Sequence, residues 1–194
     1  MSRSPLASAA AALNDALRLV QGRYVLIGGL AVVLRGFPRH TDDIDVMVLG
    51  AAASASQLMD ALASSGFVPR VENALEFAAR SQVLLMVHAD SGIELDLSLG
   101  WLPFEREAVE AAELIDIEDV PFPVARAEDL LIYKAVAWRD RDQRDIKELV
   151  RLHRDELDLE RVQRTVEQFA EAIDEPERGP EFARLVASVL RAKR

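Results

Sequence analysis

The stretch Tyr24–Val48, YVLIGGLAVVLRGFPRHTDDIDVMV, constrains the fold of this chain more than any other part of its sequence. A short apolar run meets the glycine pair Gly28 and Gly29, and an apolar segment with helical character follows. The stretch closes with two carboxylates, Asp43 and Asp45, inside a second apolar run. Because side chains alternate between faces along a strand, both carboxylates project to one side. The pattern predicts a strand, a glycine turn, a short helix and a second strand that carries two acids.

Two carboxylates on one face repel each other, and a bound cation offsets that repulsion. Mg²⁺ suits this position because it prefers oxygen ligands and binds through one or two carboxylates together with substrate phosphates. The glycine turn supplies exposed backbone N–H groups and a helix N-terminus for a phosphate. Alone, a glycine pair is more often a tight turn, and an Asp-x-Asp pair is often a solvated rim or an Asx turn. Together, with residues 30–42 between them, they indicate a metal–nucleotide site.

At these residues the sequence resembles the nucleotidyltransferase-fold superfamily, the superfamily of the DNA polymerase beta-like proteins. Its signature is an apolar residue, Gly-Gly or Gly-Ser, a helix, and Asp-x-Asp or Asp-x-Glu on the next strand, which Gly28, Gly29, Asp43 and Asp45 match position by position. The resemblance implies transfer of a nucleoside monophosphate from an NTP, such as ATP, to a hydroxyl acceptor, with Mg²⁺ or Mn²⁺ as the cofactor. It also implies nucleotide binding by the glycine pair. Further candidates for nucleotide binding are Arg39 and Thr41, in the polar link before the acids.

A third carboxylate is expected on a later strand. Residues 82–99, QVLLMVHADSGIELDLSL, predict two strands around a turn at residues 90–92. Glu94 and Asp96 alternate with apolar residues and therefore share a face. An ordinary wet strand face explains Glu94, whereas Asp96, followed by Leu97 and Ser98, matches the superfamily's third acid. The resemblance implies that this third acid completes the metal site or acts as the base toward the attacking hydroxyl. The predicted catalytic residues and metal ligands are Asp43, Asp45 and Asp96.

A second constellation lies at residues 128–149, EDLLIYKAVAWRDRDQRDIKEL. Lys134 lies among apolar residues at helical spacing, so its ammonium must reach a partner, for which phosphate or one of the three acids is the best candidate. The stretch resembles the helical segment of small bacterial nucleotidyltransferase-like proteins, including AbiEii-type toxins, which carry the same order of Lys, Arg, Asp and Asp. The resemblance implies that Lys134 lies near the triphosphate and that Arg139 and Asp142 brace the site. We expect Lys134→Ala to weaken nucleotide binding with little change in stability. The residues that match are Lys134, Arg139, Asp142, Asp145 and Ile146.

The chain of 194 residues is half hydrophobic, which suffices for one domain with a sound core or for a sheet domain with a helical appendage. We expect an α/β (α+β) fold, with a nucleotidyltransferase core over residues 1–125 and a helical region over residues 126–194. The core is expected to hold a small mixed sheet flanked by helices, including helices at residues 5–20, 54–64 and 105–112. A strand pair is expected at residues 115–124, and a linker at residues 175–180 precedes the last predicted helix.

Composition excludes several classes of protein. The chain has no cysteine, so it has neither a disulfide framework nor a thiolate zinc site, and its three histidines lack metal-ligand spacing. The helix expected at residues 5–20 is too polar to cross a membrane, and no signal-peptide pattern precedes it, so we expect a cytoplasmic protein without a membrane partner. A net charge of −10 argues against broad nucleic-acid binding, although a local basic patch is compatible with it.

Three functions remain compatible with these observations. The first is transfer to RNA, as the toxin of a toxin–antitoxin pair with an antitoxin protein as partner. The second is transfer to a small molecule, as in antibiotic-type enzymes that modify aminoglycosides. The third is a catalytically idle module that binds nucleotide or protein, which the presence of three candidate carboxylates disfavours. The sequence leaves the acceptor and the choice of NTP open.

Overall fold

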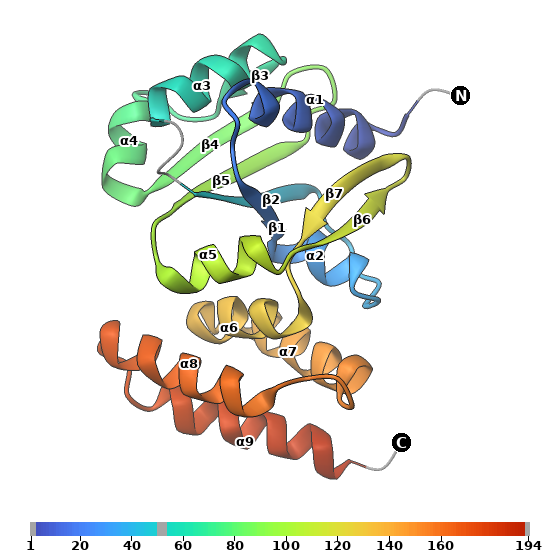
Figure 1. Ribbon diagram of the computed structural model, residues 1–194, viewed down its shortest axis with the longest axis vertical. Coiled ribbons are helices and arrows are strands. Elements are labelled where there is room, and N and C mark those ends of the chain that lie inside the picture. Colours follow the sequence, from blue (N-terminus) through green and yellow to red (C-terminus); the bar gives the residue numbers. More distant parts are fainter. Residues whose placement is uncertain (1–2, 50–53, 193–194) are drawn as a thin grey trace. The chain divides into compact units, whose positions relative to one another are not determined.

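The computed structural model describes residues 3–49 and 54–192, which fall into two compact units (Figure 1). Unit 1 comprises Met1–Leu30 and His40–Ala125, and unit 2 comprises Ala31–Arg39 and Arg126–Arg194. Unit 1 contains a seven-stranded sheet in the order β3-β4-β5-β2-β1-β7-β6. Helices α6 to α9 make up most of unit 2. The segment Ala31–Arg39, which the sequence suggests is part of the N-terminal core, thus groups with the helical residues.

Strands and helices are interspersed along the first two thirds of the chain. The strands are β1 (Tyr24–Ile27), β2 (Asp43–Leu49), β3 (Phe67–Pro69), β4 (Val83–His88), β5 (Glu94–Gly100), β6 (Glu113–Ile117) and β7 (Val120–Val124). The helices are α1 (Pro5–Leu19), α2 (Gly28–Leu34), α3 (Ala55–Ser64), α4 (Ala74–Ser81) and α5 (Pro103–Glu110). Helices α1 and α3 lie together on one side of the sheet, and α5 lies on the other (Figure 1).

The sheet is mixed. Strand β2 runs parallel to β5 and antiparallel to β1, whereas β1 runs parallel to β7. The remaining neighbours, β3 with β4, β4 with β5 and β6 with β7, are antiparallel. Fully buried Ile44, Val46, Leu95 and Leu97 hold the two central strands in the core. This arrangement confirms the predicted fold class of a mixed sheet flanked by helices.

Most predicted elements are present, and the sheet unit differs from the prediction at helices α4 and α5. Helix α5 begins at Pro103, before the predicted start at residue 105, because the fixed φ of proline suits the first helical position. Helix α4 was not predicted: residues on both sides of it, Asn73 and Gln82, have left-handed backbone conformations, and no side chain caps its N-terminus. The usual sequence signal for a helix start is therefore missing there.

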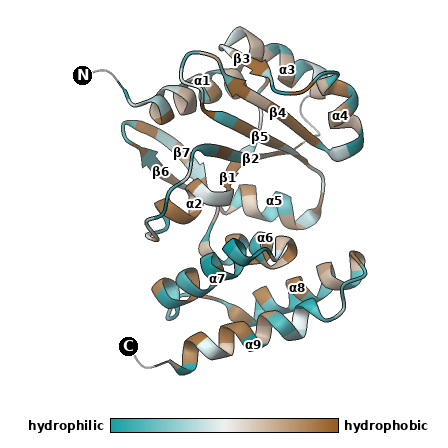
Figure 2. Ribbon diagram, turned by 180° about the vertical axis from the view of Figure 1, so that it is seen from behind, coloured by the Kyte–Doolittle hydropathy of each residue, from teal (hydrophilic) through white to brown (hydrophobic). Residues whose placement is uncertain are grey.

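The C-terminal segment of unit 2 forms helices α6 (Ala127–Ala137), α7 (Asp140–His153), α8 (Leu159–Ala172) and α9 (Arg178–Arg191). Each of α7 and α8 contacts α6, and α9 contacts both α7 and α8. Figure 2 shows α7 as mostly hydrophilic, whereas apolar and polar bands alternate along α8 and α9. The buried positions of these helices recur at helical spacing, as expected for elements that bury one face each.

Two breaks shape the helical unit. Trp138 adopts a left-handed conformation with φ of 53°, which ends α6 and separates it from α7. The guanidinium of Arg178 lies 5.1 Å from the centre of the Trp138 ring and donates to the carbonyl oxygens of Ala135 and Val136. The predicted linker at residues 175–180 extends too far, because residues 178–180 belong to α9, which begins at Arg178. Pro180 lies in the first turn of this helix, where a missing N–H has no effect. No helix among the described residues has the length and apolarity needed to cross a bilayer.

The sheet gives a first testable prediction. Phe122 is fully buried on β7 and meets the ring of Tyr24 edge-on, with 5.4 Å between ring centroids. Phe122→Ala should lower the free energy of unfolding by about 3–5 kcal/mol, because it removes a large buried ring and leaves a cavity. Leu114→Ala is the control on the paired strand β6, since Leu114 is 75% exposed, and it should change stability by less than about 0.5 kcal/mol. Urea unfolding measures both, and equal losses would contradict the packing described here.

Candidate functional site

The glycine pair lies directly at the junction of β1 and α2. Gly28 has a φ of +68°, a backbone conformation that residues with a side chain rarely adopt. A Cβ atom at Gly28 would lie 1.8 Å from Oδ2 of Asp45, so only glycine leaves room for this carboxylate. The backbone N–H of Gly29 donates to the same oxygen at 3.3 Å. The fold therefore brings the glycine turn and the second acid of Asp-x-Asp into direct contact.

Four acids project from one face of the two central strands. Asp43 and Asp45 flank buried Ile44 on β2 and therefore lie on the same side. Parallel pairing places Asp43 opposite Glu94 and Asp45 opposite Asp96. Neighbouring strands lie about 4.8 Å apart, so the acids of the two strands are close neighbours. Both pairs lie at the beginning of their strands, where the sheet meets the glycine turn.

Two residues near these acids interact with them. The hydroxyl of Thr41 donates to Oδ1 of Asp43 at 2.7 Å, which gives this predicted nucleotide-binding residue a partner in the acid group. The guanidinium of Arg70 donates to both Glu94 and Asp96. Arg70 is not among the predicted site residues. It follows a three-residue strand, and nothing in its local sequence indicates an acid partner, because the contact depends on the register of three strands.

The surroundings of Asp96 change its titration. Burial raises the pKa of the Asp96 carboxyl above its ordinary value, the charge of Arg70 opposes this, and the charges of Asp43 and Glu94 raise the pKa further. Four carboxylates lie on this face, and two of them, Glu94 and Asp96, share the guanidinium of Arg70. The electrostatics of this face favour a bound cation.

The donor chemistry fits a divalent cation such as Mg²⁺, which binds carboxylate oxygens. Asp45 and Asp96 lie opposite each other on adjacent strands, and Asp43 lies two residues away on the same face. As they are oriented, no three Asp, Glu or His side chains in residues 3–49 and 54–192 form a ready metal site. The contacts explain this orientation, since Asp96 is bonded to Arg70 and Asp43 to Thr41.

Lys134 lies in unit 2, where it is only 7% exposed. Its Nζ lies 3.1 Å from Oδ1 of Asp142 and 2.9 Å from Oδ2 of Asp145, both on α7. The helix break at Trp138 allows these contacts, because it lets the chain turn so that α7 packs beside α6. The required partner of this lysine is therefore a pair of buried carboxylates within its own unit.

Two arginines complete this network. Arg39 donates from Nη2 to Oδ2 of Asp145 at 3.2 Å, and its Nε lies 3.1 Å from Oδ1 of the same carboxylate as an ion pair. Arg139 contacts Asp142 through its side chain at 3.2 Å and through its backbone N–H at 3.1 Å. Roles of Arg39, Lys134 and Arg139 toward a nucleotide remain predictions. The expectation that Lys134→Ala changes stability little is revised, since it leaves two buried acids without their shared cation.

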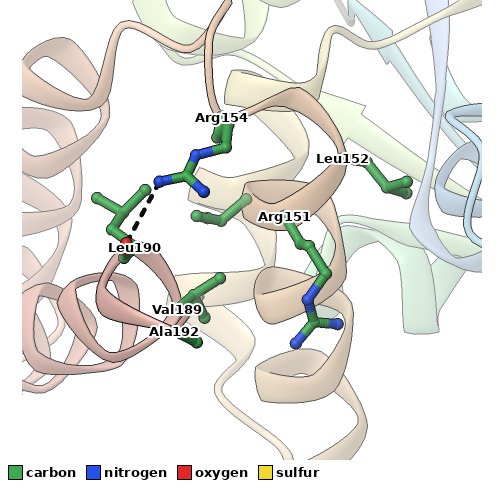
Figure 3. A pocket seen from close by; sticks show the side chains of 7 residues that line it. Arg151, Leu152, Arg154, Val189, Leu190 and Ala192 are labelled. Atoms are coloured by element: carbon green, nitrogen blue, oxygen red, sulfur yellow. Dashed lines mark hydrogen bonds between the residues drawn. The ribbon is translucent and has the colours of Figure 1, made fainter. Parts of the chain in front are cut away.

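A separate cavity of about 440 Å³ lies in unit 2 between the end of α7 and the end of α9 (Figure 3). It has apolar walls and two arginines. Arg154 donates to the carbonyl oxygen of Leu190 at 3.3 Å, and Arg151 pairs with Glu148. Both guanidinium groups are thus engaged by the protein, and none of the predicted site residues lines the cavity.

Comparisons with known proteins identify the family and the fold. The family model described as "Nucleotidyltransferase of unknown function (DUF6036)" matches residues 6–186. The solution structure of the antibiotic-resistance factor ANT(2'')-Ia has a TM-score of 0.57 at 18% identity, over 89% of this chain and 95% of that protein. Its crystal structure in complex with adenylyl-2''-tobramycin has a TM-score of 0.54 at 19% identity, over 84% and 95% of the two chains.

An antigenic nucleotidyltransferase-like protein from Paracoccidioides brasiliensis is similar over 95% of this chain and 94% of its own, with a TM-score of 0.54 at 16% identity. At such identities the structural likeness establishes a shared fold. No curated protein matches the sequence.

The contact between the glycine turn and Asp45 gives a testable prediction. Gly28→Ala should destabilise unit 1 by about 1–3 kcal/mol more than Gly92→Ala, because the added methyl group meets the Asp45 carboxylate. Gly92 is the matched control, since its φ of +72° imposes the same backbone strain but nothing lies within 4 Å of its added Cβ. Urea unfolding of the two variants checks this, and equal stabilities would show that the Asp45 carboxylate yields without loss.

The ion-pair network around Lys134 gives a testable prediction about stability. Lys134→Met should lower the free energy of unfolding by about 3 kcal/mol, because it removes the cation shared by two buried carboxylates that are each 1% exposed. Lys147→Met makes the same change at a partly exposed position of α7 and should be close to neutral. Thermal and urea unfolding measure the stability of both variants. If Lys134→Met leaves the free energy of unfolding unchanged, the buried ion pairs of this lysine do not stabilise the fold.

Proposed function

The chain belongs to a nucleotidyltransferase family, and from this premise we propose that it transfers a nucleoside monophosphate from an NTP to a hydroxyl acceptor. Family membership confirms the resemblance to the nucleotidyltransferase-fold superfamily. The observation that carries the proposal is the contact of the Gly28–Gly29 turn with Asp45, on the face that also bears Asp43 and Asp96. This face combines a place where phosphate can approach the backbone with a concentration of negative charge that calls for a cation.

Asp43, Asp45 and Asp96 are the residues that would hold Mg²⁺ or Mn²⁺. When bound, the cation neutralises charge on the phosphate oxygens and promotes ionisation of the acceptor hydroxyl. The proposal requires Asp96 to exchange its contact with Arg70 for this role. Asp45 is held toward the glycine turn by the N–H of Gly29, and Asp43 is oriented by Thr41, so both enter the reaction from fixed positions.

The chain's own residues bind the phosphates and move the proton. The turn at Gly28 and Gly29 presents backbone without side chains, so a triphosphate can approach it closely. The acceptor oxygen attacks the α-phosphorus, the bond to pyrophosphate breaks, and the hydroxyl proton passes to Asp96. Since NTPs are substrates, the cytoplasm is the proposed place of action.

We infer that the acceptor is a small molecule with hydroxyl groups and positive charge. The protein's net charge of −10 attracts a cationic acceptor and opposes a polyanion such as RNA. ANT(2'')-Ia, which shares this fold, has been crystallised with adenylyl-2''-tobramycin. Transfer to RNA by a toxin held in check by an antitoxin protein is the alternative, and it needs a local basic surface to overcome the repulsion.

One assay tests both acceptors. The purified protein is incubated with each labelled NTP, Mg²⁺ or Mn²⁺, and either an aminoglycoside panel or total RNA. The expected product is a nucleotidylated small molecule, with pyrophosphate released and no product after chelation of the metal by EDTA. Label in RNA would favour the toxin alternative, and the lack of product with every acceptor would count against transferase activity.

The roles of the acids are tested by conservative substitutions. Asp45→Asn and Asp96→Asn should each lower kcat/KM at least about 100-fold, because charge stabilisation at such a site supplies several kcal/mol. Glu94→Gln should have a smaller effect. Asp42→Asn is the control, since the Asp42 side chain is 77% exposed, and it should retain activity. An Asp96→Asn variant with full activity would remove Asp96 from the catalytic group.

A further inference from the structure

Arg70 reaches the acid group from outside the two strands that carry it. Its backbone N–H donates to the carbonyl oxygen of Leu85 at 3.0 Å, which fixes the main chain just after β3 beside β4. Leu85 is in turn the register partner of Asp96 on β5. The arginine side chain therefore extends across β4 to reach acids on the next strand, and it is only 22% exposed there.

The guanidinium divides between two carboxylates. One terminal nitrogen, Nη1, donates to Glu94, and the other, Nη2, donates to Asp96. The Nε atom of Arg70 is buried, and no hydrogen-bond partner for it exists in the described part of the chain. The guanidinium therefore donates to Asp96, which the proposed function places in the metal site, and to Glu94, which the proposed function leaves outside it.

We propose that Arg70 is a positioning residue that holds Asp96 as a built-in counter-ion until a divalent cation takes this carboxylate from it, while Glu94 retains the arginine. The inference rests on the proposed function, because it takes Asp96 as a metal ligand. The inference also gives Glu94 a role. Glu94 lies two residues before Asp96 on the same face of β5, so it keeps the guanidinium of Arg70 near Asp96 while the metal binds.

Charge supports this exchange. Removal of Arg70 takes away the guanidinium that Glu94 and Asp96 share, which raises the repulsion between these carboxylates in the free protein and favours a bound cation more strongly. A guanidinium and a metal ion that share one carboxylate compete, so Arg70 must weaken metal binding. At an effective separation of about 6 Å in a water-like dielectric, the field of one charge alone changes the affinity for a divalent ion about tenfold, and release of Asp96 adds to this effect.

The test measures Mn²⁺ binding directly, by electron paramagnetic resonance of free Mn²⁺, in the full-length protein without nucleotide. Arg70→Gln should bind Mn²⁺ about tenfold more tightly than the wild type. Arg80→Gln is the matched control, because Arg80 is 73% exposed on α4 and pairs with Glu76 of the same helix, and it should bind Mn²⁺ like the wild type. An unchanged or weaker affinity in Arg70→Gln overturns the proposal.

A double variant separates release of Asp96 from a general charge effect. Arg70→Gln combined with Glu94→Gln removes one positive and one negative charge, so the net charge equals that of the wild type. A general field effect predicts wild-type affinity, whereas release of Asp96 predicts tighter binding, and wild-type affinity here overturns the proposal. Arg70→Lys keeps the charge but not the fork, and its affinity should fall between those of the wild type and Arg70→Gln.

Two further outcomes distinguish this inference from the proposed function. Circular dichroism establishes that each variant is folded, and if Arg70→Gln does not fold, Arg70→Lys decides, since a wild-type affinity in that variant overturns the inference. If the wild type binds Mn²⁺ but the arginine variants do not differ from it, the inference fails and the metal site stands. If neither the wild type nor any variant binds Mn²⁺, the metal site fails and the inference fails with it.

Discussion

The parallel pairing of β2 with β5 is the interaction on which the rest of the site depends. Its register places Asp43 beside Glu94 and Asp45 beside Asp96. The acids do not fix this register, because like charges repel; the apolar residues between them do, since Ile44 and Leu95 are fully buried. A slip of one residue would turn the acids into the core and the apolar side chains into water. Burial on one face of the sheet thus concentrates negative charge on the other.

The groups around the acids follow from that concentration of charge. Each acid of the predicted triad has a nearby donor from another element: the backbone of Gly29 for Asp45, the hydroxyl of Thr41 for Asp43, and the guanidinium of Arg70 for Asp96. Such donors lower the free energy of ionised carboxylates. Two of the donors are weaker than a cation and can remain while one binds, whereas Arg70 carries a full charge on the same carboxylate. This difference makes Arg70 the residue through which the free and metal-bound forms would differ most.

Unit 2 is held together by a different kind of contact. Its helices bury Lys134 with Asp142 and Asp145, and they bury Asp129, which is fully enclosed and paired with Arg126 and Arg161. Buried ion pairs add little net stability compared with apolar packing, but removal of one partner is strongly destabilising. We expect these pairs to specify how α6, α7 and α8 pack, because only one arrangement satisfies each charge.

The sequence by itself determined the elements of the sheet and the type of chemistry. Alternation around Asp43, Asp45 and Asp96 and the glycine pair at the strand end are local patterns, and local backbone geometry fixes which face each residue takes. Only the tertiary structure decided the partners: Arg70 lies 26 residues from Asp96 in sequence, and Lys134 meets Asp142 because Trp138 ends a helix in a left-handed conformation. Such contacts depend on strand register and on a helix break. Local sequence patterns predict neither of these, because both arise from packing between distant segments.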